Sequence, residues 1–457
     1  MLFNSYIFIF LFLPIVWSTY IILQKTGLKK ISLLFLVGAS LFFYGYWNPA
    51  YLPLLIGSLA MNFIIGKALE RKPSKLLLAA GIAFNLGLLG YYKYVDFFLE
   101  TINRFVANDF HYLNLVLPLA ISFYTFQQIA FLVDAYRGET VPYNLLEYVL
   151  FVTFFPQLIA GPIVQHNEII PQFRENRLPL VGEHTVRGLL IFFTGLFKKT
   201  VIADSFAVWA NKGFNQPESL TVIDSWITSL SYTFQLYFDF SGYCDMAVGA
   251  ALLFNIQLPI NFNSPYKALT IQDFWKRWHM TLNRFLTKYL YYPLGGSRKG
   301  KARTYMNVMI VFFLSGLWHG AGWTFIIWGL LHGTASVVYR IWTSLGFHMH
   351  KVLAWIVTFQ FVNLTWVFFR AESVTDALTI IQTMFAWEPL TLEMIAVNRQ
   401  EIITVAVFLL VCLLFKNSNR LIAEERIGTG TTVAVAAFTV FGVLSLNRVS
   451  EFLYYNF

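Results

Sequence analysis

Two histidines in one stretch of the chain, Gln272–Gly320, could carry chemistry. His279 lies among tryptophans and cations in WKRWHMTLNRF, whereas His319 follows an almost uncharged run, Tyr305–Trp318. A neutral imidazole can accept a proton near pH 7, and an ionisable side chain inside an apolar run is costly and by default marks a function. His319 is therefore a candidate general base inside a membrane. The alternative is a histidine that only hydrogen-bonds a neighbouring helix.

The composition places this stretch in a membrane protein. The chain has 457 residues, of which 57% are hydrophobic and 12% charged, whereas soluble proteins have about 25% charged residues. We expect an all-α polytopic membrane protein with about eleven transmembrane helices and shorter re-entrant or interfacial helices. The predicted apolar segments are Leu2–Leu23, Ser32–Trp47, Tyr51–Leu69, Leu76–Tyr92, Leu113–Val133, Leu145–Ile163, Gly188–Trp209, Ser225–Leu258, Tyr305–Leu317, Trp323–Tyr339, Val352–Phe369, Ile402–Phe415 and Thr432–Leu446.

The basic residues predict the orientation. Basic residues cluster in short loops, for example after the first span and after the third, so the net charge of +9 does not indicate a nucleic-acid partner. The positive-inside rule puts both loops in the cytoplasm and the N-terminus outside a cell (inner) membrane. The basic loop Arg298–Arg303 is then cytoplasmic too. A helix from Thr304 carries His319 roughly 22 Å inward, less if Leu317 to Gly320 is unwound.

The segment QLYFDFSGYCD puts polar groups in a long apolar run and is expected to break it. Gln235 and Asp239 are four residues apart and share a helix face. A carboxylate in a membrane needs a partner, so we expect Asp239 to pair with a nearby Arg, Lys or His. A structural ion pair is favoured over direct catalysis. Asp134 is also interpreted as structural, close to Arg137.

The cations around His279 allow two interpretations. The alternation of aromatic and cationic residues is typical of one amphipathic helix that anchors the chain at the membrane interface. The functional alternative is a binding site for an anionic cytosolic donor, in which cations meet phosphate groups. The cations in question are Lys276, Arg277, Arg298 and Lys299.

Other motifs are weaker. Trp318 and Trp323 could line a pocket beside His319, and His332 is expected to be a packing residue. The remaining histidines, His166 among them, lie in polar connections and carry no signal. The sequence GGSRKGKA is close to a P-loop but lacks the Ser or Thr that would hold magnesium, and we expect no strand before it, so an ATPase is excluded. Neither cysteine has metal-ligand spacing, and no metal is expected.

The chain resembles the bacterial membrane-bound O-acyltransferases, and most of all their alginate O-acetylation branch. The matching motifs, which extend over the chain from MLFNSYIFIFLFLPIV to EFLYYNF, are LPLAISFYTFQQIAFLVDAYRGE, FFPQLIAGPIVQ, QLYFDFSGYCDMAVG, FWKRWHMTLNRFL, YYPLGGSRKG and GLWHGAGWTFIIWGLLHG. The resemblance implies one domain, 1–457, with a catalytic core at about 113–341. It also implies a ring of tilted helices around a central funnel that narrows near the catalytic histidine.

The resemblance also implies the activity. It makes His319 and His279 the catalytic pair, supported by Gln235, Asp239, Trp318, Trp278 and Asn283. An acyl thioester such as acetyl-CoA would be the donor substrate, with no tightly bound cofactor. The acyl group would pass across the membrane to an extracytoplasmic acetyltransferase partner, for O-acetylation of an alginate-like polysaccharide. Alternatives are peptidoglycan O-acetylation and D-alanyl transfer to teichoic acid. Alternatives of a different class are a proton-coupled transporter and a purely structural scaffold for a polymer-export complex. Membrane lipids are expected partners in every case.

Overall fold

The computed structural model describes residues 1–104, 106, 110–175, 182–389, 391–423, 428–447 and 453, and all regular structure within these residues is helical. The C-terminal motif 451–457 lies, apart from Leu453, outside the described residues. The chain divides into two compact units, each considered by itself. Unit 1 comprises Met1–Leu196, Tyr243–Pro259 and Glu424–Phe457, and unit 2 comprises Phe197–Gly242 and Ile260–Ala423.

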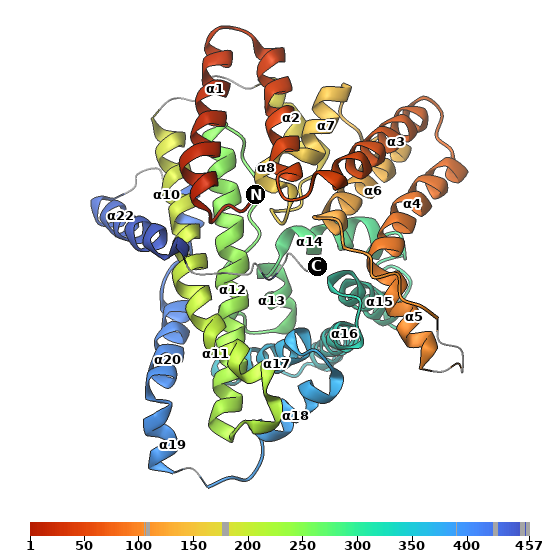
Figure 1. Cartoon of the computed structure of the whole chain (residues 1–457). Helices are drawn as coiled ribbons and strands as arrows, with labels where there is room; N and C mark the ends of the chain where they lie inside the picture. Colours follow the sequence, from red (N-terminus) through yellow and green to blue (C-terminus); the bar gives the residue numbers. More distant parts are fainter. Residues whose placement is uncertain are drawn as a thin grey trace. The chain divides into compact units, whose positions relative to one another are not determined.

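Helices of unit 1 come mainly from the first half of the chain (Figure 1). Their bounds are α1 Leu13–Lys25, α2 Lys29–Gly45, α3 Leu52–Arg71, α4 Lys75–Leu89, α5 Val95–Asn103, α6 Ile121–Arg137, α7 Leu145–Thr153, α8 Phe155–Leu158, α9 His166–Glu175, α10 Glu183–Phe197 and α22 Thr429–Leu444. The predicted apolar segment Leu145–Ile163 is divided between α7 and α8, with Pro156 in the first turn of α8.

Helices of unit 2 include the two predicted histidines. Their bounds are α11 Asp204–Asn215, α12 Val222–Leu253, α13 Ile271–Arg277, α14 Met280–Leu286, α15 Lys301–His319, α16 Trp323–Ser344, α17 Lys351–Arg370, α18 Val374–Met384, α19 Leu392–Val397, α20 Arg399–Leu414 and α21 Arg420–Ala423. The last turns of α12 belong to unit 1. A π-helical segment, Lys198–Ala203, joins α10 to α11.

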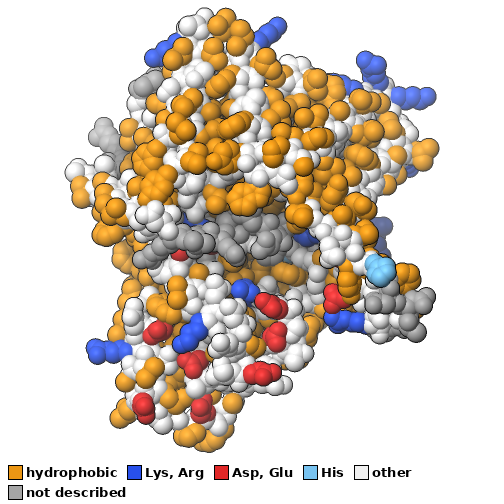
Figure 2. Space-filling model, viewed as in Figure 1, with side chains coloured by type: hydrophobic (Ala, Val, Ile, Leu, Met, Phe, Trp, Pro, Cys, Tyr) orange, Lys and Arg blue, Asp and Glu red, His pale blue; other side chains and the backbone are white. Residues whose placement is uncertain are grey.

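Five helices in the described part of the chain are long and apolar enough to cross a membrane: Phe8–Lys25, Pro49–Arg71, Lys75–Asn103, Lys351–Arg370 and Thr429–Asn447. The prediction of about eleven spans stays a prediction. The lipid-facing character is clear at the surface of unit 1. Figure 2 shows hydrophobic side chains over α1–α4, with basic side chains where α1 turns into α2 and α3 into α4. Leu76 is 82% exposed and Ile64 is 64% exposed, as lipid contact requires.

Two predicted segments need correction. The polar SGYCD segment does not break its span, because α12 is one continuous helix of 32 residues. Asp239, on the same helix, forms an ion pair that is described below. Because this pair compensates the buried charge, α12 does not have to break to bring Asp239 to water. The predicted span Leu113–Val133 is helical only from Ile121, because Pro118 and the left-handed Ala120 (φ 60°) precede the helix.

The α15–α16 hairpin positions His319. The two helices pack along their length as an antiparallel pair (Figure 1). A side-chain carbon on Gly316 would collide with the Phe325 carbonyl oxygen, and one on Gly329 with that of Phe312. Further along, a side-chain carbon on Gly333 would lie 3.0 Å from the sulfur of Met309. Glycine at these positions therefore lets the backbones approach, as in small-residue helix contacts in membranes.

This contact yields a stability prediction. Gly329→Ala should destabilise unit 2 by about 1–3 kcal/mol, because the added methyl group overpacks the helix contact. The matched control is Gly57→Ala in α3, where nothing lies within 4 Å of the added carbon. That variant should keep or raise the melting temperature of the detergent-purified protein. Equal melting temperatures for the two variants would contradict the close contact.

Candidate active site

His319 ends α15 inside a cage of aromatic rings. It is 1% exposed, and its ring centroid lies 4.9 Å from that of Trp318, 5.1 Å from Trp328 and 5.3 Å from Phe369. The helix remains intact through His319 and ends at Gly320, where a side chain would collide with the ring of Phe325. The imidazole is thus held by rigid elements in a water-poor environment, as a catalytic base requires.

The prediction that His279 lies in one amphipathic helix at the membrane interface is wrong. It stands between α13 and α14 in the left-handed conformation, with φ 44°, and is 1% exposed. The physical reason is Asn261. The Asn261 carbonyl accepts the Met280 N–H at 3.0 Å, and its side-chain Oδ1 accepts the Thr281 N–H at 3.2 Å and the Thr281 hydroxyl at 2.9 Å. These bonds compensate the strained turn.

The same asparagine fixes the tautomer of His279. Its Nδ1 lies 3.1 Å from Asn261 Oδ1, an oxygen that already accepts from Thr281, so Nδ1 donates. Nε2 then has only a lone pair. It is buried and has no hydrogen-bond partner within the described part of the chain. His279 lies outside the five candidate spans, and burial lowers its pKa to about 3. The neutral ring therefore presents one unused acceptor.

The structure brings the two histidines together. Their ring centroids are 6.4 Å apart, and Trp318 contacts both, at 6.2 Å from His279. Phe240 closes the other side of His279 at 4.9 Å. Two imidazoles in one aromatic enclosure suit the handling of one proton and one polar substrate. Trp323 is 45% exposed, and its place beside His319 stays a prediction.

Two predicted supporting residues hold the backbone of this region. Trp278 is 1% exposed and packs on Phe274 at 5.7 Å and Trp366 at 5.0 Å. Asn283 donates from its side chain to the Trp275 carbonyl at 3.0 Å. The Asn283 bond links α14 to α13, whereas Trp278 packs the end of α13 against Trp366 of α17. Both contacts position His279 through the backbone.

Asp239 pairs with Lys199, which confirms that the carboxylate has a cationic partner. The Lys199 ammonium lies 2.6 Å from Asp239 and 3.0 Å from Asp204, and the three side chains are 2%, 1% and 10% exposed. Lys199 occupies the π-helical segment before α11. Gln235 lies one turn before Asp239 and is also buried, and its Oε1 has no partner among the described residues. The cluster joins α12 to the α10–α11 segment.

The four predicted donor-binding cations differ in their exposure and in whether they already form an ion pair. Lys276, Arg298 and Lys299 are exposed, whereas Arg277 pairs with Asp273 at 2.9 Å. No strand precedes the turn that carries Arg298 and Lys299, which agrees with the rejection of a P-loop. Asn307 in α15 ties this turn to the hairpin by donating to the Gly296 carbonyl at 2.9 Å. The basic turn and His319 are therefore at opposite ends of one rigid helix.

A charge asymmetry surrounds these residues. The segment 274–371 contains no Asp or Glu, so all 24 acidic residues of the chain lie outside it. The same segment contains both His279 and His319. Cations without nearby carboxylates produce a positive potential that attracts anions. Sequence inspection could have found this signal, but motif spacing alone does not reveal it.

Sequence reasoning missed one buried histidine. His166 was assigned to a polar connection, but it is 1% exposed and its Nε2 lies 3.1 Å from the Asp134 carboxylate. Asp134 pairs with His166, whereas the sequence suggested Arg137 nearby; the structural role of Asp134 stays a prediction. The pair links the end of α6 to the start of α9 within unit 1. No local motif predicted this contact, because Asp134 and His166 are far apart in the sequence.

His332 is a packing residue, as predicted. It accepts from Trp275 Nε1 at 3.3 Å and contacts the Thr365 hydroxyl at 3.0 Å, so both ring nitrogens are used inside the helix packing. Within the described residues, no group of three His, Cys, Asp or Glu side chains could hold a metal ion.

Comparison with known proteins identifies the class. The model of the membrane-bound O-acyltransferase (MBOAT) family matches residues 136–374, which include both histidines of the enclosure. A peptidoglycan O-acetyltransferase of Helicobacter pylori is 45% identical, and the match covers 100% of this chain and 98% of that protein. The chain belongs to the membrane-bound O-acyltransferase family. It is therefore an acyltransferase and a membrane protein.

Two further relatives are named for other polymers. The probable alginate O-acetylase AlgI of Pseudomonas aeruginosa is 37% identical over 85% of this chain and 75% of its own. A teichoic acid D-alanyltransferase of Bacillus subtilis is 27% identical over 54% of this chain and 67% of its own. The resemblance to the alginate O-acetylation branch is confirmed, but the prediction that this branch is the most similar is not, because the peptidoglycan O-acetyltransferase shares the higher identity.

The Lys199 cluster gives a testable prediction. Lys199→Met should destabilise the protein by about 3–5 kcal/mol, because it leaves two buried carboxylates without their cation. The control is Arg104→Gln, which removes a pair whose side chains are 61% and 49% exposed and should cost at most about 1 kcal/mol. Thermal unfolding in detergent measures both. A Lys199→Met protein as stable as the control would show that the cluster is not a structural ion pair.

Proposed function

We propose that this chain transfers an acetyl group from a cytoplasmic thioester across the membrane, for O-acetylation of a cell-surface polysaccharide. The observation that supports this most is the enclosure in which His319 and His279 lie 6.4 Å apart between ring centroids. Residues 1–457 act as one domain with its catalytic core at about 113–341, arranged around a funnel. The location is the cell (inner) membrane, with the N-terminus outside.

The donor is an anionic thioester such as acetyl-CoA. Its phosphates would meet Arg298, Lys299 and Lys276, which are exposed and lie in a segment free of acidic residues. Arg277 would contribute after exchanging its Asp273 partner. The acetylated end would then extend along the α15–α16 hairpin towards His319. No tightly bound cofactor takes part.

His319 is the proposed general base. It would take the proton of the acceptor hydroxyl while the hydroxyl oxygen attacks the thioester carbonyl carbon. The carbon–sulfur bond breaks, the acetyl ester forms, and the thiolate leaves and is protonated. His279 Nε2 can only accept a hydrogen bond in its fixed tautomer, so it would orient the donor by accepting from an amide N–H of the thioester arm. Trp318 separates this chemistry from water.

The acceptor polymer has two candidates. Peptidoglycan is the first, because the 45% identical relative that matches the full length of this chain is a peptidoglycan O-acetyltransferase. An alginate-like exopolysaccharide is the second, because the alginate O-acetylase relatives share 37% identity over 85% of this chain. An extracytoplasmic acetyltransferase partner would receive the acetyl group in either case.

An ester assay in cells tests this function. A strain lacking the gene is complemented with the intact gene, with His319→Ala or with the exposed-histidine control His111→Ala. Acetate and D-alanine released by mild base are measured separately in peptidoglycan, exopolysaccharide and teichoic acid fractions. We expect acetate to be restored in peptidoglycan by the intact gene and by His111→Ala but not by His319→Ala. Restoration by His319→Ala to the level of the intact gene would refute the proposed base.

The cationic turn predicts a salt-dependent donor affinity. Replacing Arg298 and Lys299 with Gln should raise the KM for acetyl-CoA about tenfold at low ionic strength and less in 0.5 M salt, because exposed charges are screened. A pair of exposed cations at the start of α2, Lys29 and Lys30 replaced with Gln, serves as the control. An unchanged KM in the first variant would mean that the phosphates bind elsewhere.

A further inference from the structure

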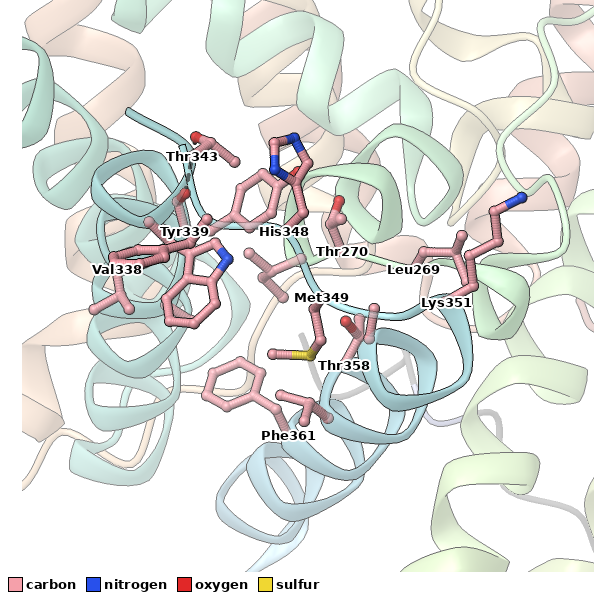
Figure 3. A pocket seen from close by; sticks show the side chains of 16 residues that line it. Leu269, Thr270, Val338, Tyr339, Thr343, His348, Met349, Lys351, Thr358 and Phe361 are labelled. Atoms are coloured by element: carbon pink, nitrogen blue, oxygen red, sulfur yellow. Dashed lines mark hydrogen bonds between the residues drawn. The ribbon is translucent and has the colours of Figure 1, made fainter. Parts of the chain in front are cut away.

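An apolar cavity lies in unit 2 between the C-terminal half of α16 and the N-terminal half of α17 (Figure 3). Its volume is about 420 Å³, which is within the usual range of roughly 300–1,000 Å³ for small-molecule sites. Figure 3 shows Met349 and Phe361 pointing into the cavity, His348 at its edge and the Lys351 amino group directed outward. None of the 16 lining residues is acidic.

The α16–α17 contact is closely packed at one end and open at the other. Deeper in the contact, large rings fill the space: Trp328 meets Phe369 at 5.0 Å and His332 meets Phe361 at 5.2 Å. Nearer the other end, the cavity is lined by small side chains, Ala335, Ala354 and Thr358, together with large apolar ones such as Tyr339 and Trp342.

The register of the hairpin gives the level of the cavity mouth. Gly316 contacts Gly329, and Gly333 contacts Met309, so α15 and α16 run antiparallel. Extending this register brings Trp342 and Thr343 at the cavity to the level of Lys301 at the start of α15. The mouth is therefore at the same end of the hairpin as the basic turn. This end is where a span meets lipid headgroups.

The charges at the mouth have one sign. Lys351 begins the candidate span Lys351–Arg370, and His348 and His350 precede it; all three are exposed. No carboxylate occurs in the surrounding segment 274–371. Basic residues next to a hydrocarbon-lined recess between membrane helices match an anionic lipid, whose phosphate meets the cations while an acyl chain fills the recess.

We propose that this cavity binds one acyl chain of an anionic phospholipid, with the lipid phosphate held by Lys351. The acyl chain and the lipid headgroup would contact different residues. Each of the two contacts can therefore be removed by its own substitution. Bound lipid would fill the gap between α16 and α17 and brace α16, which carries Trp328 of the His319 enclosure. This proposal does not depend on which polymer the enzyme acetylates.

Native mass spectrometry of the full-length protein tests the proposal. The detergent-purified chain is mixed with equal amounts of phosphatidylglycerol and phosphatidylcholine that carry the same acyl chains. The intact protein should retain one phosphatidylglycerol in preference to phosphatidylcholine. Lys351→Gln, at an exposed position that should not affect folding, should weaken the preference about fivefold. Ala354→Phe fills the cavity and should lose the retained lipid.

Matched controls separate the site from general lipid binding. Lys30→Gln removes an exposed cation elsewhere, and Ala434→Phe adds a ring on the exposed side of α22; both should behave as the intact protein. Equal retention of the two lipids by the intact protein, or an unchanged lipid count in Ala354→Phe, would overturn the proposal. Displacement of the lipid by acetyl-CoA would assign the cavity to the donor and overturn it as well. No activity is measured, so failure here leaves the proposed function untouched.

Discussion

The close glycine contact between α15 and α16 is the constraint on which unit 2 depends. Two helices can approach this tightly only where neither has a side chain, at Gly316 and Gly329. The contact fixes where α15 ends, and His319 is its last residue. It also brings Trp328 of α16 against the imidazole, at 5.1 Å between ring centroids. A loosened hairpin would move the base and open its aromatic cage together.

Distribution of charge is the second organising feature. Carboxylates are absent from segment 274–371, yet a buried carboxylate at Asp239 is retained on α12, where Lys199 neutralises it. Buried ions are costly unless paired, so this cluster serves to join helices. The cations of the acid-free segment remain exposed at Lys276, Arg298 and Lys299, where they can act on a ligand. The structural ion pair of Lys199 and the cations available for a ligand thus lie in different segments of the chain.

Sequence patterns predicted the helical class, the pairing of Asp239 and the packing role of His332, because burial and charge compensation leave periodic or local signals. These patterns did not predict the hydrogen-bond partners of His279 and His166. Asn261 lies 18 residues before His279, and Asp134 lies 32 residues before His166. No local spacing encodes such contacts. The left-handed backbone conformation at His279 likewise depends on Asn261. The position is not a glycine, the residue that usually marks this conformation in a sequence.

The most direct test of the site is a cryo-electron microscopy structure of the full chain with a non-hydrolysable acetyl-CoA analogue. Our account predicts the acyl carbonyl inside the aromatic cage, within about 4 Å of the His319 ring, with the analogue's amide near His279 Nε2. The phosphates should lie beside Arg298 and Lys299. An acyl group found away from this cage, for example beside the buried His166–Asp134 pair of unit 1, would contradict the assignment of His319 as the base.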